Sequence, residues 1–330
     1  MQTPTWFYKK SHPVALLLWP VSQLYRLTVL GRRMAYSIGL KKIHRLPVPV
    51  IVVGNITVGG TGKTPLVIWL AEQCKSLGYK PGIILRGYKG ESQEWPQLVT
   101  PESDPALVGD EAVVIARRTN CPVCADPDRP NAARTLIENG DVDLIISDDG
   151  LQHYALARDI EIMVIDGARR YGNGMLLPAG PLREHRKRAS HADLVVTNGT
   201  VGVGEYGLRQ KATTTVNMVT GERRPLSFWR YVLVHAVAGL GNPQRYFRIL
   251  EEAGVEVTRH PFEDHHDYTS SDLDFSDENP IMMTEKDAVK CVDFADDSYW
   301  YLELDIDLDN NFADAVTRAL RFTNKGPVNG

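Results

Sequence analysis

Acidic residues are absent from the first 71 residues of this chain, although the full 330 residues contain 41 of them. The basic residues of that stretch are Lys9, Lys10, Arg26, Arg32, Arg33, Lys41, Lys42, Arg45 and Lys63. The net charge of the whole chain is only −4, which excludes a general nucleic-acid-binding protein, so we expect no nucleic-acid partner. The early segment is instead suited to an anionic surface.

Cysteine is also scarce, because the chain has only four. This number excludes a disulfide framework in a chain of this size. Cys121 and Cys124 form a CxxC pair, but no second cysteine pair or nearby histidine pair would complete a zinc site. We therefore expect a buried apolar pair on a strand over 122–125, in a protein on the reducing, cytoplasmic side of the membrane.

Long hydrophobic runs are missing. The apolar run Val14–Val21 is well short of the roughly 20 residues that span a bilayer, and no small-residue cleavage site follows it. The run predicts a basic amphipathic helix whose apolar side carries Leu16, Leu17, Trp19, Leu24, Tyr25, Leu27, Leu30 and Met34. Such a helix can lie in a membrane interface, where each basic residue contributes about 1 kcal/mol against anionic lipid. Its residues alone leave a second interpretation equally open, namely packing on the protein's own core.

From residue 46 onward, short apolar runs alternate with helical patterns, which predicts an α/β fold with a mostly parallel sheet. Strands are expected at 48–53, 82–85, 122–125, 143–147, 160–165 and 193–197, and helices at 64–77, 110–118 and 129–139. The strands are continuously hydrophobic, as in sheets covered by helices on both faces. Together with the Gly-rich turn described below, this pattern predicts a P-loop NTPase-like domain.

The alternating pattern weakens over 199–221 and resumes with a strand at 231–238 and a helix at 243–253. We interpret residues 1–225 as a P-loop domain that includes the N-terminal basic segment. Residues 226–330 then form a smaller α/β domain with a ribbon-like connection. Its last strand, 299–304, and last helix, 311–322, are expected to return toward the first domain.

A Gly-rich turn follows the first predicted strand and opens a helix. The residues of this turn are Thr57, Val58, Gly59, Gly60, Thr61, Gly62, Lys63 and Thr64. Glycines let backbone N–H groups point at phosphate oxygens, the lysine reaches the β- and γ-phosphates, and the Thr64 hydroxyl is placed for Mg²⁺. Thr57 stands where the usual pattern has its first glycine, so the loop is a variant form. We expect it to bind ATP.

A pair of carboxylates, Asp148 and Asp149, ends the apolar run 144–147. At the carboxyl edge of a strand beside a phosphate loop, one of them can hold Mg²⁺ directly or through water. A dimeric ATPase switch of the partitioning type uses a similar loop. Such switches carry a lysine directly before the glycine pair, where this chain has Val58, which counts against that interpretation.

Further motifs follow the loop in a characteristic order. They are Gly54-Asn55, Arg86-Gly87-Tyr88, Val108-Gly109-Asp110-Glu111, Asp128-Arg129, Asp148-Asp149-Gly150-Leu151-Gln152-His153, Leu177-Pro178-Ala179-Gly180-Pro181-Leu182-Arg183-Glu184, Ala238-Gly239-Leu240-Gly241-Asn242-Pro243, Asp264-His265 and Thr284-Glu285-Lys286-Asp287-Ala288. On these motifs the chain resembles the tetraacyldisaccharide 4'-kinase (lipid A 4'-kinase) family over nearly its whole length. One variation is Leu151, where an aromatic residue is more usual.

The resemblance implies transfer of the ATP γ-phosphoryl group to the 4'-hydroxyl of a tetraacylated disaccharide 1-phosphate. This places the protein at the cytoplasmic face of the bacterial inner membrane and favours the membrane interpretation of the N-terminal segment. Asp110 resembles the family's catalytic base and His265 its partner. From the residues alone, Asp110 would more readily be a helix cap, and His266 would serve as well as His265.

The remaining roles also rest on the resemblance. Arg129 and Arg183 suit bidentate phosphate binding, to the substrate's 1-phosphate or to the transferring group. Gln152 and Glu184 are expected near the Mg²⁺ shell, with Glu184 also placed for the substrate. Charges interpreted as solvated surface are those of Arg186, Lys187, Arg188, Asp305, Asp307 and Asp309. A kinase of another sugar remains an alternative, and we expect a monomer.

Overall fold

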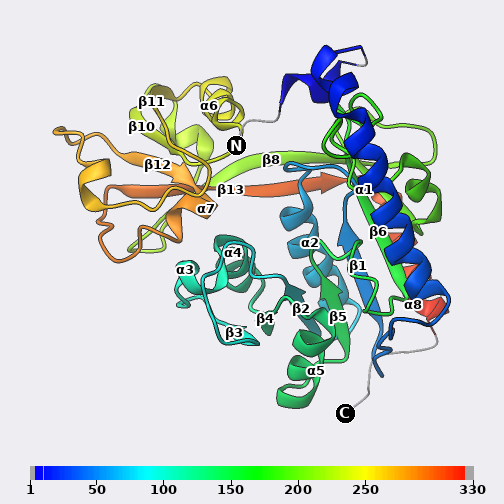
Figure 1. Ribbon diagram of the computed structural model, residues 1–330. Coiled ribbons are helices and arrows are strands. Elements are labelled where there is room, and N and C mark those ends of the chain that lie inside the picture. Colours follow the sequence, from blue (N-terminus) through cyan, green and yellow to red (C-terminus); the bar gives the residue numbers. More distant parts are fainter. Residues whose placement is uncertain (1–3, 10, 324–330) are drawn as a thin grey trace.

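The computed structural model describes residues 4–9 and 11–323. Lys10, one of the basic residues of the early segment, lies outside this range. In Figure 1 the described chain forms two lobes joined by a long pair of strands. We call them the N-terminal lobe, built around β1 to β7, and the C-terminal lobe, built around β10 to β12.

The N-terminal lobe contains a mostly parallel sheet in the order β7-β6-β1-β5-β2-β4-β3. Its strands are β1 (Val50–Gly54), β2 (Pro81–Leu85), β3 (Gln97–Val99), β4 (Val123–Ala125), β5 (Leu144–Ser147), β6 (Ile160–Asp166) and β7 (Leu194–Asn198). Only the edge strand β3 runs antiparallel to its neighbour. The predicted strands are confirmed with small changes at their ends, and so is the α/β fold class.

Helices cover both faces of this sheet because its strands are apolar on both sides. The helices are α2 (Lys63–Ser76), α3 (Pro105–Val108), α4 (Asp110–Thr119) and α5 (Arg129–Asn139). On β1, Ile51 and Val53 join the core shared with α2 and α4, whereas Val50 and Val52 join the core that contains α5 residues. This alternation is the two-residue period of a strand, and full burial on each side explains the uninterrupted hydrophobic runs.

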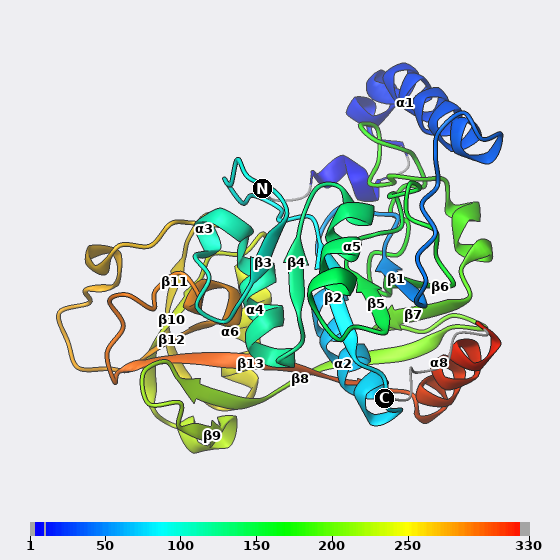
Figure 2. The same ribbon diagram turned by 90° about the horizontal axis from the view of Figure 1, so that it is seen from below.

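Two long antiparallel strands, β8 (Tyr206–Asn217) and β13 (Tyr299–Leu308), connect the lobes and extend the sheet from β7 (Figures 1 and 2). The C-terminal lobe continues with β13-β12-β10-β11. Its elements are β9 (Arg223–Pro225), β10 (Leu233–Ala238), α6 (Pro243–Glu252), β11 (Glu256–Pro261), β12 (Ile281–Thr284) and α7 (Glu285–Ala288). The final helix α8 (Asn310–Phe322) returns to the N-terminal lobe, where the ring of Phe312 lies 5.5 Å from that of Trp69. The division into domains at residues 225 and 226 stays a prediction.

Short 3-10 helices occupy several connections, namely η1 (Thr5–Tyr8), η2 (Arg186–His191), η3 (Leu226–Trp229) and η4 (Ser270–Leu273). Within η2, Arg188 is buried and its guanidinium pairs with Glu161 and, at 3.8 Å, with Glu184. The prediction that Arg188 is a surface charge is therefore wrong, because its guanidinium forms ion pairs with two buried carboxylates. Asp305 is also no free surface charge, since it pairs with Arg118 of α4.

The cysteine pair behaves as predicted. Cys121 and Cys124 are both buried, and both are free thiols. Cys124 lies in β4 and packs in the same core as Val52 of β1. Burial raises the pKa of the Cys124 thiol to about 12, so this thiol stays protonated and unreactive at neutral pH.

Helix α1 (Pro13–Ser37) lies along the side of the N-terminal lobe (Figures 1 and 2). Of the apolar residues predicted to share one side, nearly all are exposed: Leu16, Leu17, Trp19, Leu24, Leu27, Leu30 and Met34. The Ser22 hydroxyl donates to the Leu176 carbonyl at 2.9 Å and the Tyr25 hydroxyl to the Arg183 carbonyl at 3.1 Å. The helix thus attaches through polar contacts, so the interpretation that its apolar side packs on the protein's own core is wrong.

Candidate active site

The phosphate loop is held in shape from outside and from within. The Val58 N–H donates to the Pro181 carbonyl at 2.9 Å, and Thr57 forms an isolated antiparallel bridge with Leu182. Inside the loop, the buried Asn55 amide donates to Thr61 Oγ1 at 3.3 Å, while Asn55 Oδ1 accepts from Lys63 Nζ at 3.4 Å. Contacts within the protein itself therefore hold the shape of the loop.

Gly62 supplies the conformation with which the loop enters α2. Its φ of 93° lies in the left-handed region, and a Cβ there would sit 3.2 Å from the side-chain nitrogens of Asn198 and Gln210. Gly62 is the N-cap of α2, so the free N–H groups of that helix begin directly after it. This is the geometry that binds phosphate at a helix N-terminus.

Asp148 and Asp149 follow β5, which pairs with β1 in the sheet, so both lie beside the loop. Asp149 lies 3.5 Å from Lys63 Nζ and accepts a hydrogen bond from Arg183 at 2.9 Å. Burial raises the pKa of Asp149, but the charges of Lys63 and Arg183 outweigh it and leave this pKa below its ordinary value. Asp149 is therefore ionised at neutral pH.

Asp148 is more deeply buried than its neighbour, and its Oδ1, like that of Asp149, has no hydrogen-bond partner among the described residues. Burial, and next the nearby Glu111 carboxylate, raise the pKa of Asp148 to about 7. A buried carboxylate oxygen without a partner is a suitable ligand for a cation, because a cation would offset the cost of burying its charge.

The donor set near the loop fits magnesium. Among residues 4–9 and 11–323, no group of three or more His, Cys, Asp or Glu side chains is arranged to hold a metal by itself. Magnesium is usually held by one or two carboxylates together with water and the substrate's phosphates, so a preformed cage is not required. Asp148 and the Thr64 hydroxyl at the start of α2 meet that requirement.

Asp110 and His265 meet across the two lobes. Asp110 is the first residue of α4, and His265 lies in the loop after β11. His265 Nδ1 lies 2.9 Å from Asp110 Oδ2, within hydrogen-bond distance. Burial raises the pKa of Asp110, but the hydrogen bond from His265 and the charge of Lys290 lower it below its ordinary value.

Capping does not explain Asp110, because the N-cap of α4 is Gly109 and no side chain caps this helix. Gly109 has a φ of 90°, and a Cβ there would lie 2.7 Å from the Tyr88 carbonyl oxygen. The glycine therefore allows a close turn that points Asp110 at the other lobe. His266 contacts Asp272 instead, at 3.5 Å, which favours His265 as the partner.

The other predicted residues form a second layer. Gln152 Nε2 donates to Glu184 Oε1 at 2.9 Å, and Tyr154 donates to the other oxygen of Glu184. Arg129 is 1% exposed, and its guanidinium donates to the carbonyls of Asp126 and Asp148. Burial lowers the pKa of Arg129 to about 10, and the group stays charged at neutral pH. These contacts hold the chain where β4 and β5 end, so Arg129 positions Asp148 by binding the backbone carbonyl of Asp148.

Three charged residues without a predicted role also lie here. Glu111 follows Asp110 and pairs with Lys286, while Lys290 lies 3.7 Å from Asp110 Oδ2. Both lysines come from α7 and the residues directly after it, in the other lobe. No pattern within either segment shows this pairing, because it depends on how the lobes pack.

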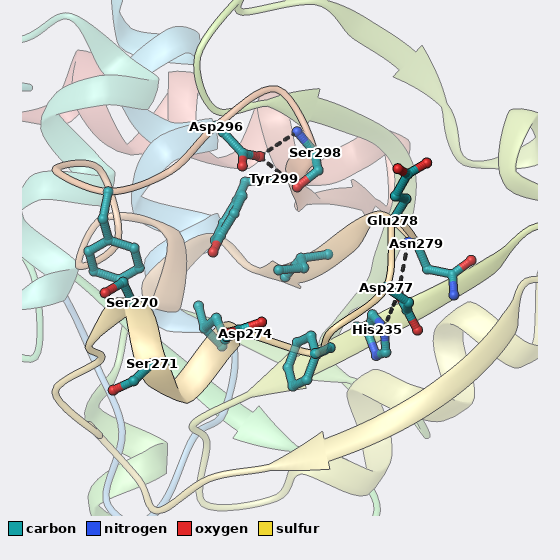
Figure 3. Close-up of a pocket in the computed structure, with 14 residues that line it drawn as sticks. His235, Ser270, Ser271, Asp274, Asp277, Glu278, Asn279, Asp296, Ser298 and Tyr299 are labelled. Atoms are coloured by element: carbon teal, nitrogen blue, oxygen red, sulfur yellow. Dashed lines mark hydrogen bonds and ion pairs between the residues drawn. The ribbon is translucent and has the colours of Figure 1, made fainter.

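Two cavities lie away from the phosphate loop. One, of about 480 Å³, lies between the end of α1 and the start of α5 and has a basic lining that includes Arg32, Lys41, Lys42 and Arg129. The other, of about 530 Å³, lies where β10, β12 and β13 begin, the edge opposite the active site. Figure 3 shows His235 and Asp277 in contact there, with Glu278 close by, Asp274 elsewhere on the lining and Asp296 across the pocket beside Ser298. Its acidic lining does not suit a nucleotide.

A parallel sheet whose first strand leads into this loop, with carboxylates at the end of the adjacent strand, defines a P-loop nucleotide-binding protein. A family model described as Tetraacyldisaccharide-1-P 4'-kinase matches residues 14–321. The chain therefore belongs to the tetraacyldisaccharide-1-P 4'-kinase family, which confirms the resemblance inferred from its motifs.

Individual relatives agree with this assignment. The chain is 49% identical to a tetraacyldisaccharide 4'-kinase of Nitrosococcus oceani, covering 98% of this chain and 96% of the relative. It is 48% identical to one from Pseudomonas aeruginosa, over 90% of both chains. The solved structure of LpxK from Aquifex aeolicus in complex with ATP superposes with a TM-score of 0.80 at 29% identity, covering 93% of this chain and 99% of that one.

Proposed function

We propose that this protein is an ATP-dependent kinase that phosphorylates the 4'-hydroxyl of a tetraacyldisaccharide 1-phosphate, a step of lipid A biosynthesis. The observation that carries this proposal is the family match over residues 14–321. The contact between Asp110 and His265, in the same molecule as an organised phosphate loop, supports it. A nucleotide switch would need no such pair.

The reaction needs a proton acceptor for a sugar hydroxyl. The hydroxyl oxygen attacks the γ-phosphorus, the bond from that phosphorus to the bridging oxygen breaks, and ADP leaves. Asp110 takes the hydroxyl proton, and His265 orients the carboxylate and shares that proton. Positioning and charge neutralisation by the loop and Lys63 supply most of the rate, as in other phosphoryl transfers.

ATP binds the loop from Thr57 to Thr64 in this proposal, with its phosphates on the backbone N–H groups and on Lys63. The Thr64 hydroxyl and Asp148 would hold Mg²⁺, with Asp149 beside them and Gln152 supporting the site through its bonds to the Asn55 carbonyl and Glu184. When bound, magnesium neutralises charge on the β- and γ-phosphates. This assignment is supported by Asp148 Oδ1 and Asp149 Oδ1, two buried carboxylate oxygens without a hydrogen-bond partner among the described residues.

The lipid acceptor approaches from the side of α1. The basic cavity between α1 and α5 suits the 1-phosphate, and Arg129 forms part of its wall. Arg183 donates to Asp149 at 2.9 Å and is partly exposed, so it can contact either the acceptor or the transferring group. Glu184 supports this region through Gln152 and Tyr154.

Membrane association follows from the substrate, whose acyl chains stay in the bilayer, and from the exposed apolar side of α1. Among the described residues, α1 is the single helix long and apolar enough to cross a membrane. Its contacts with Leu176 and Arg183 hold it along the N-terminal lobe, so we assign it to the interface of the cytoplasmic leaflet. We propose that the protein acts there as a monomer.

Replacing Leu17 with aspartate should weaken binding to vesicles by about 10- to 100-fold, because an exposed leucine contributes roughly 1.5–3 kcal/mol when it enters an apolar phase. Leu17 is 78% exposed, so the folded protein should tolerate the change. Flotation with vesicles of phosphatidylcholine and phosphatidylglycerol measures the binding. Val203→Asp, in an exposed loop outside α1, is the matched control. Equal flotation of Leu17→Asp and the unmodified protein would contradict the interface assignment.

The proposed function is tested by incubating the protein with γ-labelled ATP, Mg²⁺ and a detergent-solubilised tetraacyldisaccharide 1-phosphate. We expect label in the lipid fraction. Soluble aminosugars in parallel reactions test for a kinase of another sugar. Nucleotide-dependent dimerisation without a labelled lipid would instead identify an ATPase switch and overturn the proposal.

A further inference from the structure

We propose that Lys290 is a positioning residue for phosphoryl transfer, because its ammonium group both orients the Asp110 carboxylate and fixes the loop that carries His265. The inference rests on the proposed function, since it acts through the proposed base. It concerns a residue that lies in the C-terminal lobe, whereas Asp110 lies in the N-terminal lobe.

The ammonium group of Lys290 is enclosed by groups from both lobes. Its Nζ lies 3.7 Å from Asp110 Oδ2 and 3.5 Å from Asp287 Oδ1, and it donates to the His266 carbonyl at 2.7 Å. The Tyr268 ring covers it, with its centroid 5.1 Å away. Only 8% of the side chain is exposed, so water screens these contacts weakly.

The bond from Lys290 to the His266 carbonyl acts on the loop that presents the imidazole of His265. His265 has a φ of 64°, a left-handed conformation that is costly for a residue other than glycine. Its N–H donates to the Gly239 carbonyl at 3.2 Å, so this bond and the one from Lys290 hold the strained turn from both sides. Without Lys290, one of these two restraints is lost.

Neutralising Asp287 accounts for only part of the position of Lys290. Asp287 Oδ2 accepts hydrogen bonds from the Gly239 N–H at 3.0 Å and from the Thr284 hydroxyl, while its buried Oδ1, which has no hydrogen-bond partner among the described residues, lies 3.5 Å from Lys290 Nζ. Lys290 Nζ lies at almost the same distance from the carboxylates of Asp110 and Asp287, so it does not pair with Asp287 alone. A group that served Asp287 alone would have no reason to reach the other lobe.

Spacing along the chain supports the same conclusion. Lys286 lies in α7 and Lys290 lies two residues after its end, so the two lysines are four residues apart on one short segment. They contact Glu111 and Asp110 respectively, and these acids are the first two residues of α4. Two lysines of one lobe thus face two adjacent acids of the other.

His265 and Lys290 both contact Oδ2 of Asp110, which leaves Oδ1 as the oxygen to accept the hydroxyl proton.

A double-mutant cycle tests this role. Lys290→Met keeps the aliphatic stem but removes the charge, and we expect it to lower kcat about 10-fold with little change in KM for ATP or acceptor. Lys290→Arg should recover most of that loss because it retains the charge. In an Asp110→Asn background, Lys290→Met should cause no further loss, since a residue that acts through Asp110 has nothing left to position. Lys211→Met, which removes a lysine from an exposed ion pair on the ribbon, is the matched control.

An equal loss from Lys290→Met in both backgrounds would overturn the proposal, as would an effect confined to KM. Lys290→Gln is measured in the same cycle, so that the test stands if the methionine variant fails to fold, as judged by thermal melting and ATP binding. Failure of the proposed function looks different, because the unmodified protein would then label no lipid. Failure of the base assignment is also distinct, since Asp110→Asn alone would keep its full rate.

Discussion

Replacing Asp110 with asparagine will lower kcat by about 10²–10⁴-fold, the usual contribution of a general base in a positioned site. Asparagine keeps the size of the side chain but cannot take the hydroxyl proton. The Asp110 side chain meets His265 and Lys290 and makes no cap to its own helix, so folding should be little affected. Steady-state kinetics with the lipid acceptor measure the loss, and calorimetry should show nearly unchanged ATP affinity.

Asp104→Asn is the matched control for this experiment. Asp104 caps the short helix α3 just before α4, and its carboxylate accepts from the Ala106 N–H at 2.8 Å. Asparagine caps helices about as well as aspartate, so this variant should keep both stability and rate. A normal rate in Asp110→Asn would remove the base assignment and leave Asp110 as a contact between the lobes.

Lys63→Met will lower kcat/KM by about 10²–10³-fold, because it removes one charged donor aimed at the phosphates. Lys63 Nζ lies 3.4 Å from Asn55 Oδ1 and 3.5 Å from Asp149, so the loop already holds it in place. ATP affinity should fall with the rate, since the lysine contacts the ground state as well. Calorimetry with ATP and Mg²⁺, together with the labelled-lipid assay, separates the two effects.

Lys80→Met provides the comparison for Lys63. Lys80 pairs with Asp141 at the surface, next to β2 and away from the loop. Exposed pairs of this kind contribute about 0–1 kcal/mol, so activity and stability should both stay close to those of the unmodified protein. If Lys63→Met behaved like Lys80→Met, the assignment of the phosphate loop would be wrong.

Local patterns in the sequence were sufficient to predict the phosphate loop and the carboxylates beside it. The strand, the glycines and Lys63-Thr64 are contiguous, so their arrangement follows from one turn between β1 and α2. The carboxylates after β5 were found for the same reason, because parallel strands bring their carboxyl ends to one edge. The weak pattern over 199–221 was harder to interpret, since it contains the 12-residue strand β8. Its middle part, residues 209–214, alternates between exposed and half-buried side chains, so it lacks the hydrophobic run that marks a strand buried on both faces.

Contacts between the lobes could not be derived in this way. Asp110 and His265 are 155 residues apart, and only the family's motifs connected them. The contacts of Lys286, Lys290 and Arg188 could not be predicted from the sequence, because a single charged residue carries no periodicity that shows which distant segment will face it. Their positions depend on packing between elements that are distant along the chain.

The ribbon of β8 and β13 joins the two lobes along one side only. The chain passes from one lobe to the other twice, once in β8 and once in β13, and main-chain hydrogen bonds hold these two strands together. Away from it, the lobes meet through Val289, which is buried in the core of the N-terminal lobe, and through the pairs of Asp110 with His265, Glu111 with Lys286 and Arg118 with Glu285. Dissolved ions screen exposed pairs far more than buried ones, and of these three only Glu111 with Lys286 is about one-third exposed. Rising ionic strength should therefore weaken this outer pair first and leave the contact between Asp110 and His265 nearly unchanged, so an assay at high salt separates the two contacts.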